Sequence, residues 1–97
     1  MTIARLYHMQ AAPGKADALA TALEDVAKLV RTVEGNEGVE LLKSVDDAES
    51  FTFIEKWVSV AAHKKCLEGL DKQIVAPMRA ALGKPPEAFY LDYVMTI

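Results

Sequence analysis

The sequence predicts an α+β protein whose elements follow the ferredoxin-like order β-α-β-β-α-β, a split βαβ arrangement. Four segments alternate in side-chain character as strands do, and two longer segments repeat apolar residues at helical spacing. Their order places one helix between the first and second strands and the other between the third and fourth. In such a fold the helices cover one face of the sheet and leave the other face open.

The first part of the chain supplies a strand and a long helix. Residues 2–10 are rich in β-branched and aromatic side chains and predict the first strand, which residues 12–14 (Ala-Pro-Gly) end. A helix is expected over residues 15–33 because its apolar residues recur every three or four positions. This apolar stripe consists of Leu19, Leu23, Val26, Val30 and Val33. Residues 35–38 (Gly-Asn-Glu-Gly) suit left-handed backbone conformations and are expected to end the helix.

The middle of the chain predicts a β-hairpin. Residues 39–45 and 51–57 are the expected second and third strands, and the polar residues 46–50 form the turn between them. In the third strand, alternation puts Phe51, Phe53, Glu55 and Trp57 on one face. The only Trp of the chain is therefore aimed at the space between the sheet and a helix, where a small domain would keep a pocket.

Helical spacing resumes after the hairpin. Ser59 is a plausible N-cap, and the helix is expected to run to about residue 69 and to restart toward residue 82. Its apolar stripe comprises Val60, His63, Leu67, Leu70 and Ile74. Pro77 predicts a kink or a new helix start near residue 76, because proline donates no backbone hydrogen bond. Residues 87–94 predict the last strand, with Phe89 and Tyr93 on one face and Tyr90 on the other.

Length and hydrophobicity favour one domain that pairs with a second copy. The 97 residues correspond to a single domain, residues 1–97, and so short a chain buries a modest fraction of its surface. Hydrophobic residues nevertheless make up 52% of the sequence, and the strands carry apolar residues on both faces, such as Leu41 beside Leu42. We therefore expect a homodimer formed through the uncovered sheet face, toward which His8 points.

Composition excludes several other partners. The net charge is −3 and the densest basic cluster is only Lys64 and Lys65, so no nucleic-acid-binding surface is expected. No segment approaches the ~20 apolar residues of a membrane-spanning helix. The one Cys cannot form an internal disulfide, which makes a reduced, cytoplasmic setting the default expectation. Neither metal-ligand spacing nor a glycine-rich phosphate loop is present, so no metal and no cofactor are expected.

Several short motifs resemble one known family. Pro-Gly-Lys at residues 13–15 precedes the long helix, a Gly-led strand begins the hairpin, and Ile-Glu-Lys-Trp at residues 54–57 precedes an Ala-rich helix. Over roughly residues 3–94 the chain resembles the antibiotic biosynthesis monooxygenase (ABM) superfamily, whose members are dimeric α/β barrels of ferredoxin-like protomers. The resemblance implies a cofactor-independent monooxygenase that oxidises a small electron-rich aromatic, quinol or enediol with O₂.

Six residues are predicted to form its site. His63 is the predicted catalytic base, because an imidazole that titrates near neutral pH can remove a phenolic or enolic proton. The predicted substrate-binding residues are Trp57, Phe53, Glu55, Tyr7 and Cys66. Glu55 needs a partner when buried, such as Arg5 or a backbone group. Purely structural roles remain open for His63, as a hydrogen-bonded core residue, and for Trp57, whose large ring buries apolar area.

Two departures from the family pattern support an alternative function. The actinorhodin-type monooxygenases carry an Asn at the place of Phe53, and many quinol-oxidising relatives carry a His at about the place of Cys66. The alternative is a non-catalytic dimeric domain of the same fold that binds a small ligand or is associated with stress. Oxygen consumption on a panel of quinols and anthrones distinguishes the two functions.

Overall fold

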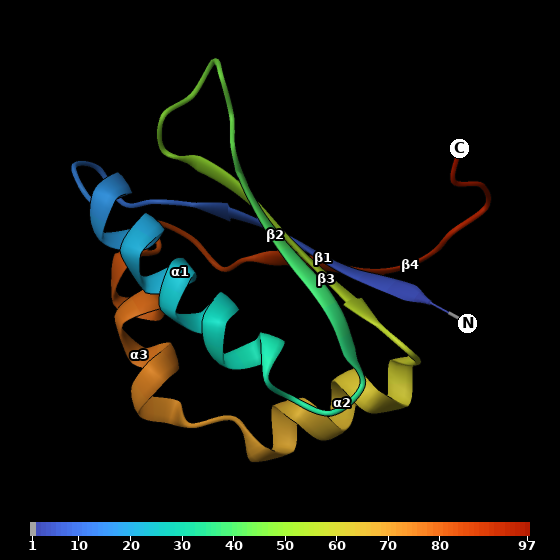
Figure 1. Cartoon of the computed structure of the whole chain (residues 1–97). Coiled ribbons are helices and arrows are strands. Elements are labelled where there is room, and N and C mark those ends of the chain that lie inside the picture. Colours follow the sequence, from blue (N-terminus) through green and yellow to red (C-terminus); the bar gives the residue numbers. More distant parts are fainter. Residues whose placement is uncertain (1) are drawn as a thin grey trace.

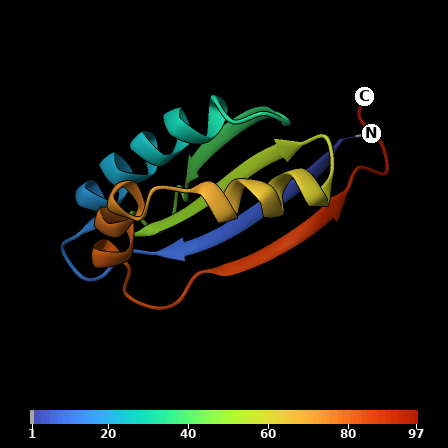
Figure 2. The same cartoon turned by 90° about the horizontal axis from the view of Figure 1, so that it is seen from below.

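The computed structural model of the protein describes residues 2–97, so residue 1 of the expected domain lies outside the described residues, and it confirms the ferredoxin-like α+β fold. The elements are β1 Ile3–Gln10, α1 Ala16–Arg31, β2 Asn36–Lys43, β3 Ser50–Trp57, α2 Val60–Gly69, α3 Lys72–Ala81 and β4 Glu87–Asp92. The strands form one antiparallel sheet in the order β2-β3-β1-β4. Figures 1 and 2 show the helices on one face of this sheet, with α1 beside α3.

Strand register decides which side chains share the face under the helices. β1 pairs with β3 so that Tyr7 lies opposite Phe53 and Arg5 opposite Glu55. On its other edge β1 pairs with β4, where Arg5 lies opposite Tyr90. Because paired residues point to the same side of a sheet, these five residues all face the helices.

The hydrophobic core fills the layer between the sheet and the helices. From α1 come Leu19, Leu23, Val26 and Val30, all buried as the helical spacing predicts. From β3 come Phe51, Phe53 and Trp57, which alternate with half-buried residues along the strand. The apolar stripe of the helix, which repeats every 3.6 residues, therefore packs against the apolar face of the strand, which repeats every 2 residues.

Several predicted boundaries are wrong around the turn between α1 and β2. The helix ends at Arg31 rather than at residue 33, and β2 begins at Asn36 rather than at residue 39. Within the segment 35–38 only Gly35 has a left-handed backbone, with φ of 90°. Asn36 and Gly38 instead form a bulge at the start of β2, where Asn36 Oδ1 accepts a hydrogen bond from the Gly38 amide at 3.1 Å. At the other end of the chain, the last strand stops at residue 92 rather than at 94.

The first part of the second helical region ends at residue 69 as predicted, but the next helix begins at Lys72 rather than near residue 76. The break falls at residues 70–71, after Gly69, and Asp71 caps the new helix by accepting a hydrogen bond from the Gln73 amide at 2.9 Å. Pro77 lies inside α3, where its missing amide removes one helical hydrogen bond without ending the helix. The buried residues of α2 are His63 and Cys66, whereas Leu67 is about half exposed (49%).

The sheet face away from the helices is partly apolar and open. Leu42, Phe89 and Leu91 are 49%, 44% and 44% exposed on this face. His8 lies there as expected, against the ring of Phe89 and 3.2 Å from the Thr52 hydroxyl. Within residues 2–97, none of the helices has the length and apolar character that crossing a bilayer requires.

Candidate functional site

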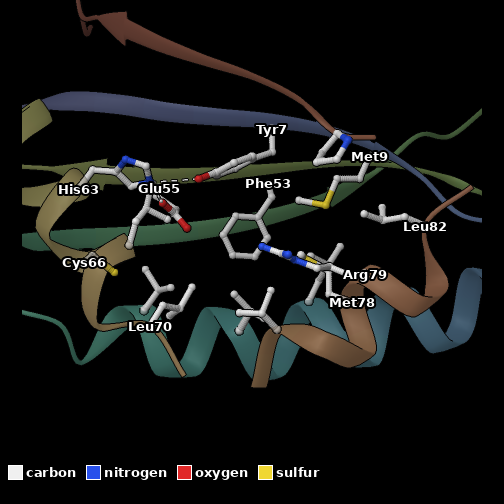
Figure 3. A pocket seen from close by; sticks show the side chains of 16 residues that line it. Tyr7, Met9, Phe53, Glu55, His63, Cys66, Leu70, Met78, Arg79 and Leu82 are labelled. Atoms are coloured by element: carbon white, nitrogen blue, oxygen red, sulfur yellow. Dashed lines mark hydrogen bonds and ion pairs between the residues drawn. The ribbon is translucent and has the colours of Figure 1, made fainter. Parts of the chain in front are cut away.

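A cavity of about 370 Å³ lies between the sheet and the helices α1, α2 and α3. Figure 3 shows side chains from both layers pointing into it. Its lining residues are Tyr7, Met9, Leu23, Val26, Val30, Phe53, Glu55, His63, Cys66, Leu67, Leu70, Val75, Met78, Arg79, Leu82 and Pro86. Most of these side chains are apolar, so the cavity suits a compact, largely apolar ligand.

The polar end of the cavity is built around His63. This side chain is 1% exposed, and both of its ring nitrogens lie near tyrosine hydroxyls. Nε2 is 3.0 Å from the Tyr7 hydroxyl of β1, and Nδ1 is 2.7 Å from the Tyr90 hydroxyl of β4. The two strands therefore fix the imidazole from both sides.

Tyr90 was not among the predicted site residues. Alternation within the last strand correctly separates Tyr90 from Phe89, but it does not say which of the two faces the helices. The pairing of β4 with β1 settles that question, because it places Tyr90 opposite Arg5 and leaves Phe89 on the open face. The distinguishing signal is the register between strands distant in sequence, which a single sequence does not carry.

Glu55 is held by a partner other than those expected. Among residues 2–97, neither Arg5 nor a backbone amide donates a hydrogen bond to its carboxyl; instead, Oε1 accepts a hydrogen bond from Trp57 Nε1 at 3.0 Å. The same oxygen is 3.5 Å from His63 Nε2. Burial raises the pKa of Glu55 to about 7, against the opposing effects of the Trp57 hydrogen bond and the Arg5 charge.

The other titratable groups of this cluster favour their neutral forms. Burial, with a smaller effect of the Arg5 charge, lowers the pKa of His63 to about 4. Since the imidazole is then uncharged near pH 7, its contact with Glu55 is not an ion pair under those conditions. Burial and the nearby Glu55 carboxyl raise the pKa of Tyr7 to about 12, so its hydroxyl keeps its proton.

Arg5 provides the positive charge of the cluster. Its guanidinium carbon lies 4.2 Å from the centre of the Tyr90 ring and 5.0 Å from that of Tyr7, both within cation–π range. Its Nε atom is buried and has no hydrogen-bond partner among residues 2–97. The cation therefore acts on Glu55 and His63 through space, and within the described part of the chain the Glu55 carboxyl accepts a hydrogen bond from Trp57 alone.

The structure brings five of the six predicted site residues to the cavity surface. These are Tyr7, Phe53, Glu55, His63 and Cys66. Trp57 is not among the lining residues: its ring is fully buried, packs edge-on against His63 at 5.6 Å and donates a hydrogen bond to the Glu55 carboxyl. Burial raises the pKa of the Cys66 thiol, which suits a small apolar lining residue. The catalytic and substrate-binding roles of these residues stay predictions.

The opposite end of the cavity carries Arg79, which was not among the predicted site residues either. Arg79 belongs to the last turn of α3, and Figure 3 shows it beside Phe53 and Met78. The end of α2 at about residue 69 agrees with the prediction, but α3 begins at Lys72 and not near residue 76, where Pro77 predicted a new start. Among residues 2–97, no group of three or more His, Cys, Asp and Glu side chains is placed to hold a metal ion.

Solved structures of similar fold come from several bacteria. SnoaB of Streptomyces nogalater, a cofactor-independent oxygenase crystallised as a point mutant, superposes with a TM-score of 0.86 at 15% identity, covering 99% of this chain and 96% of that one. PA3566 of Pseudomonas aeruginosa gives 0.84 at 22% identity, with coverage of 97% and 95%. Rv0793 of Mycobacterium tuberculosis gives 0.83 at 18% identity, with coverage of 99% and 98%. At these identities the likeness shows the fold alone.

The sequence itself matches one family. No curated protein matches the chain. The antibiotic biosynthesis monooxygenase family, in contrast, matches residues 2–69, a span that contains β1 to α2 and therefore Tyr7, Glu55 and His63. Since this match covers more than half of the sequence, the protein belongs to the antibiotic biosynthesis monooxygenase family.

Proposed function

We propose that this protein is a cofactor-independent monooxygenase that acts on a small electron-rich aromatic, quinol or enediol. In the overall reaction the substrate loses two hydrogens and gains one oxygen atom from O₂, while the second oxygen atom leaves as water. The substrate supplies all the electrons. Removal of one substrate proton is needed first, because the resulting anion is electron-rich enough to react with O₂.

The observation that carries this proposal is the composition of the cavity. Apolar side chains from the sheet and helices line most of it, and a buried cluster of Tyr7, Glu55 and His63 lies at one end. An apolar wall holds a flat ring and excludes water, and proton-accepting groups at one end can act on a hydroxyl of that ring. His63 is the predicted base within this cluster.

Family membership and one structural neighbour support the same chemistry. The chain belongs to the antibiotic biosynthesis monooxygenase family, and SnoaB, which superposes over 99% of this chain, is a cofactor-independent oxygenase. We extend that activity to this protein as part of the proposal.

The proposed enzyme is a cytoplasmic homodimer. The apolar residues Leu42, Phe89 and Leu91 on the open sheet face support pairing of two sheets into a barrel. A single free cysteine, which is buried, is compatible with the reducing cytoplasm.

Oxygen consumption tests the proposal. The wild type is supplied with a panel of quinols, anthrones and naphthols, and O₂ uptake is followed with an electrode beside His63→Ala and Trp57→Phe. We expect saturable uptake with at least one class and a loss of about 100-fold or more in His63→Ala. Uptake no faster than the spontaneous reaction with every class would reject the monooxygenase.

One observation favours a second candidate function, a dimeric domain that binds a small ligand without turnover. Phe53 is buried and turns an apolar ring to the cavity, so no amide at this position is available to hold a substrate oxygen. Saturable binding of a panel compound without accelerated O₂ uptake is the result that this candidate predicts.

A further inference from the structure

His63 has no free lone pair to offer a ligand in either neutral tautomer. If Nδ1 carries the proton, it donates to the Tyr90 hydroxyl, and Nε2 accepts from the Tyr7 hydroxyl. If Nε2 carries the proton, it donates to Tyr7, and Nδ1 accepts from Tyr90. In both cases the two nitrogens of this buried ring are occupied by protein groups.

The Glu55 carboxyl, in contrast, keeps one oxygen free. Oε1 accepts from Trp57, whereas Oε2 has no hydrogen-bond partner among residues 2–97 and is not enclosed by protein. Figure 3 shows this carboxyl pointing into the cavity beside His63 and Cys66. It is therefore the acidic group of the cavity lining that a ligand hydroxyl can approach directly.

The groups around Glu55 keep both of its protonation states accessible. β1 contributes Arg5 and Tyr7, β3 contributes the Trp57 indole, and α2 contributes His63 and Cys66. The α1 residues that line the cavity are apolar. Burial outweighs the Arg5 charge and raises the pKa of Glu55 to about 7. A group that titrates near the working pH can both accept and return a proton.

We propose that Glu55 is the residue that exchanges a proton with the ligand and that His63 is a positioning residue, fixed by Tyr7 and Tyr90 beside the carboxyl. This inference rests on the proposed function and deepens it. In the step, the O–H bond of the ligand breaks and its electron pair stays on the ligand oxygen. The proton forms a new O–H bond at Glu55 Oε2, and no electrons pass to the protein.

The same geometry defines the chemical class of the ligand. Its reacting end is an uncharged hydroxyl donor, as in a phenol or an enol, because an anionic carboxylate would be repelled by ionised Glu55. The rest of the ligand is apolar and compact enough for a cavity of about 370 Å³. A naphthol combines these properties, and we use 2-naphthol as the probe.

Anaerobic binding of 2-naphthol tests the inference without any turnover. Affinity is measured by fluorescence from about pH 5.5 to about pH 8.5, where the free naphthol is neutral. In the wild type we expect Kd to fall about tenfold as pH rises through 7, because an ionised carboxylate accepts a stronger hydrogen bond than a protonated one. Glu55→Gln, whose amide oxygen can still accept from Trp57, should bind with no pH dependence.

Three further variants separate the roles of the cluster. Glu24→Gln changes an exposed carboxyl on α1 and should behave as the wild type. His63→Gln should keep the pH dependence but shift its midpoint, since the carboxyl remains and its neighbour changes. Tyr90→Phe, which removes the hydroxyl bonded to Nδ1, should shift the midpoint in the same way, whereas Tyr93→Phe outside β4 should not.

Kinetics provide the second measurement for any compound that the wild type oxidises. We expect kcat/KM to rise with pH up to about 7 and then to level off, and Glu55→Gln to lower it at least about 100-fold and remove this rise. If no compound is oxidised, the proposed function fails, and the binding experiment still decides the role of Glu55.

The opposite pattern would overturn the inference. It is wrong if Glu55→Gln keeps the pH-dependent binding of 2-naphthol, or if His63→Gln alone abolishes it. Should Glu55→Gln not fold, carbon-13 NMR of side-chain carboxyls in the wild type replaces it. The carboxyl that titrates near pH 7 must then shift on addition of 2-naphthol, and an unchanged signal would reject the contact.

Discussion

Glu55 and His63 are buried side by side, and burial changes their pKa values in opposite directions. The pKa of Glu55 rises from 4.5 to about 7, so the folded state holds a proton that the unfolded state has lost. Its contribution to stability is present below about pH 4.5 and is lost as pH rises through 7. The pKa of His63 falls from 6.5 to about 4, so its contribution is present above about pH 6.5 and is lost as pH falls through 4.

The unfolding free energy therefore depends on pH with opposite signs for the two groups, and these two slopes nearly cancel in the wild type between about pH 4.5 and pH 6.5. Glu55→Gln should reveal the His63 effect, with an unfolding free energy that rises relative to wild type by up to about 2 kcal/mol across this interval. His63→Gln should reveal the Glu55 effect, a fall of similar size. Urea denaturation at the two pH values measures both slopes, and parallel pH dependence in all three proteins would contradict these shifts.

The sequence predicts a residue's position correctly where the periodicity of a single strand or helix determines which face that residue occupies. Alternation within the third strand placed Phe53 and Glu55 on the buried face, and helical spacing placed His63 on the apolar stripe of the helix that follows. The partners of these residues were not predictable, because Tyr90 and Trp57 reach them through strand register and side-chain geometry. Sequence spacing contains neither quantity.

At the scale of elements, the turn at Gly35 connects α1 to β2 and also supports the start of α2. Gly35 has φ of 90°, and a Cβ there would lie 2.9 Å from Ala62 Cβ and 3.3 Å from Val58 Cγ2. Gly35→Ala should lower the unfolding free energy by about 2–4 kcal/mol, since backbone strain and crowding add.

Gly14→Ala is the matched control for this substitution. Gly14 has φ of 77°, but a Cβ at this position would meet no atom within 4 Å, so alanine there should cost only the strain of about 1 kcal/mol. Urea denaturation of the two variants separates crowding from strain. Equal losses of unfolding free energy in the two variants would mean that crowding of the added Cβ at residue 35 costs nothing.

The helices also show how far element prediction reaches. Strong amphipathic spacing located α1 and its buried stripe, whereas the break between α2 and α3 follows from Gly69 and the Asp71 cap rather than from Pro77. Proline was given too much weight, since a helix tolerates the loss of one hydrogen bond when the surrounding packing is favourable.

At the scale of the whole molecule, the helices cover only one face of the sheet, and the other presents Leu42, Phe89 and Leu91. A stable dimer interface buries about 800 Å² per partner, which a sheet face of this kind can supply.

If this face forms the dimer, Phe89→Glu combined with Leu91→Glu should convert the protein to monomers, because four carboxylates would be buried across the two-fold axis. Val45→Glu, at an exposed loop residue, is the control and should leave the dimer intact. Light scattering coupled to size-exclusion chromatography measures the mass of each variant. A wild type that is monomeric at every concentration, or a double variant that remains dimeric, would exclude this face as the interface.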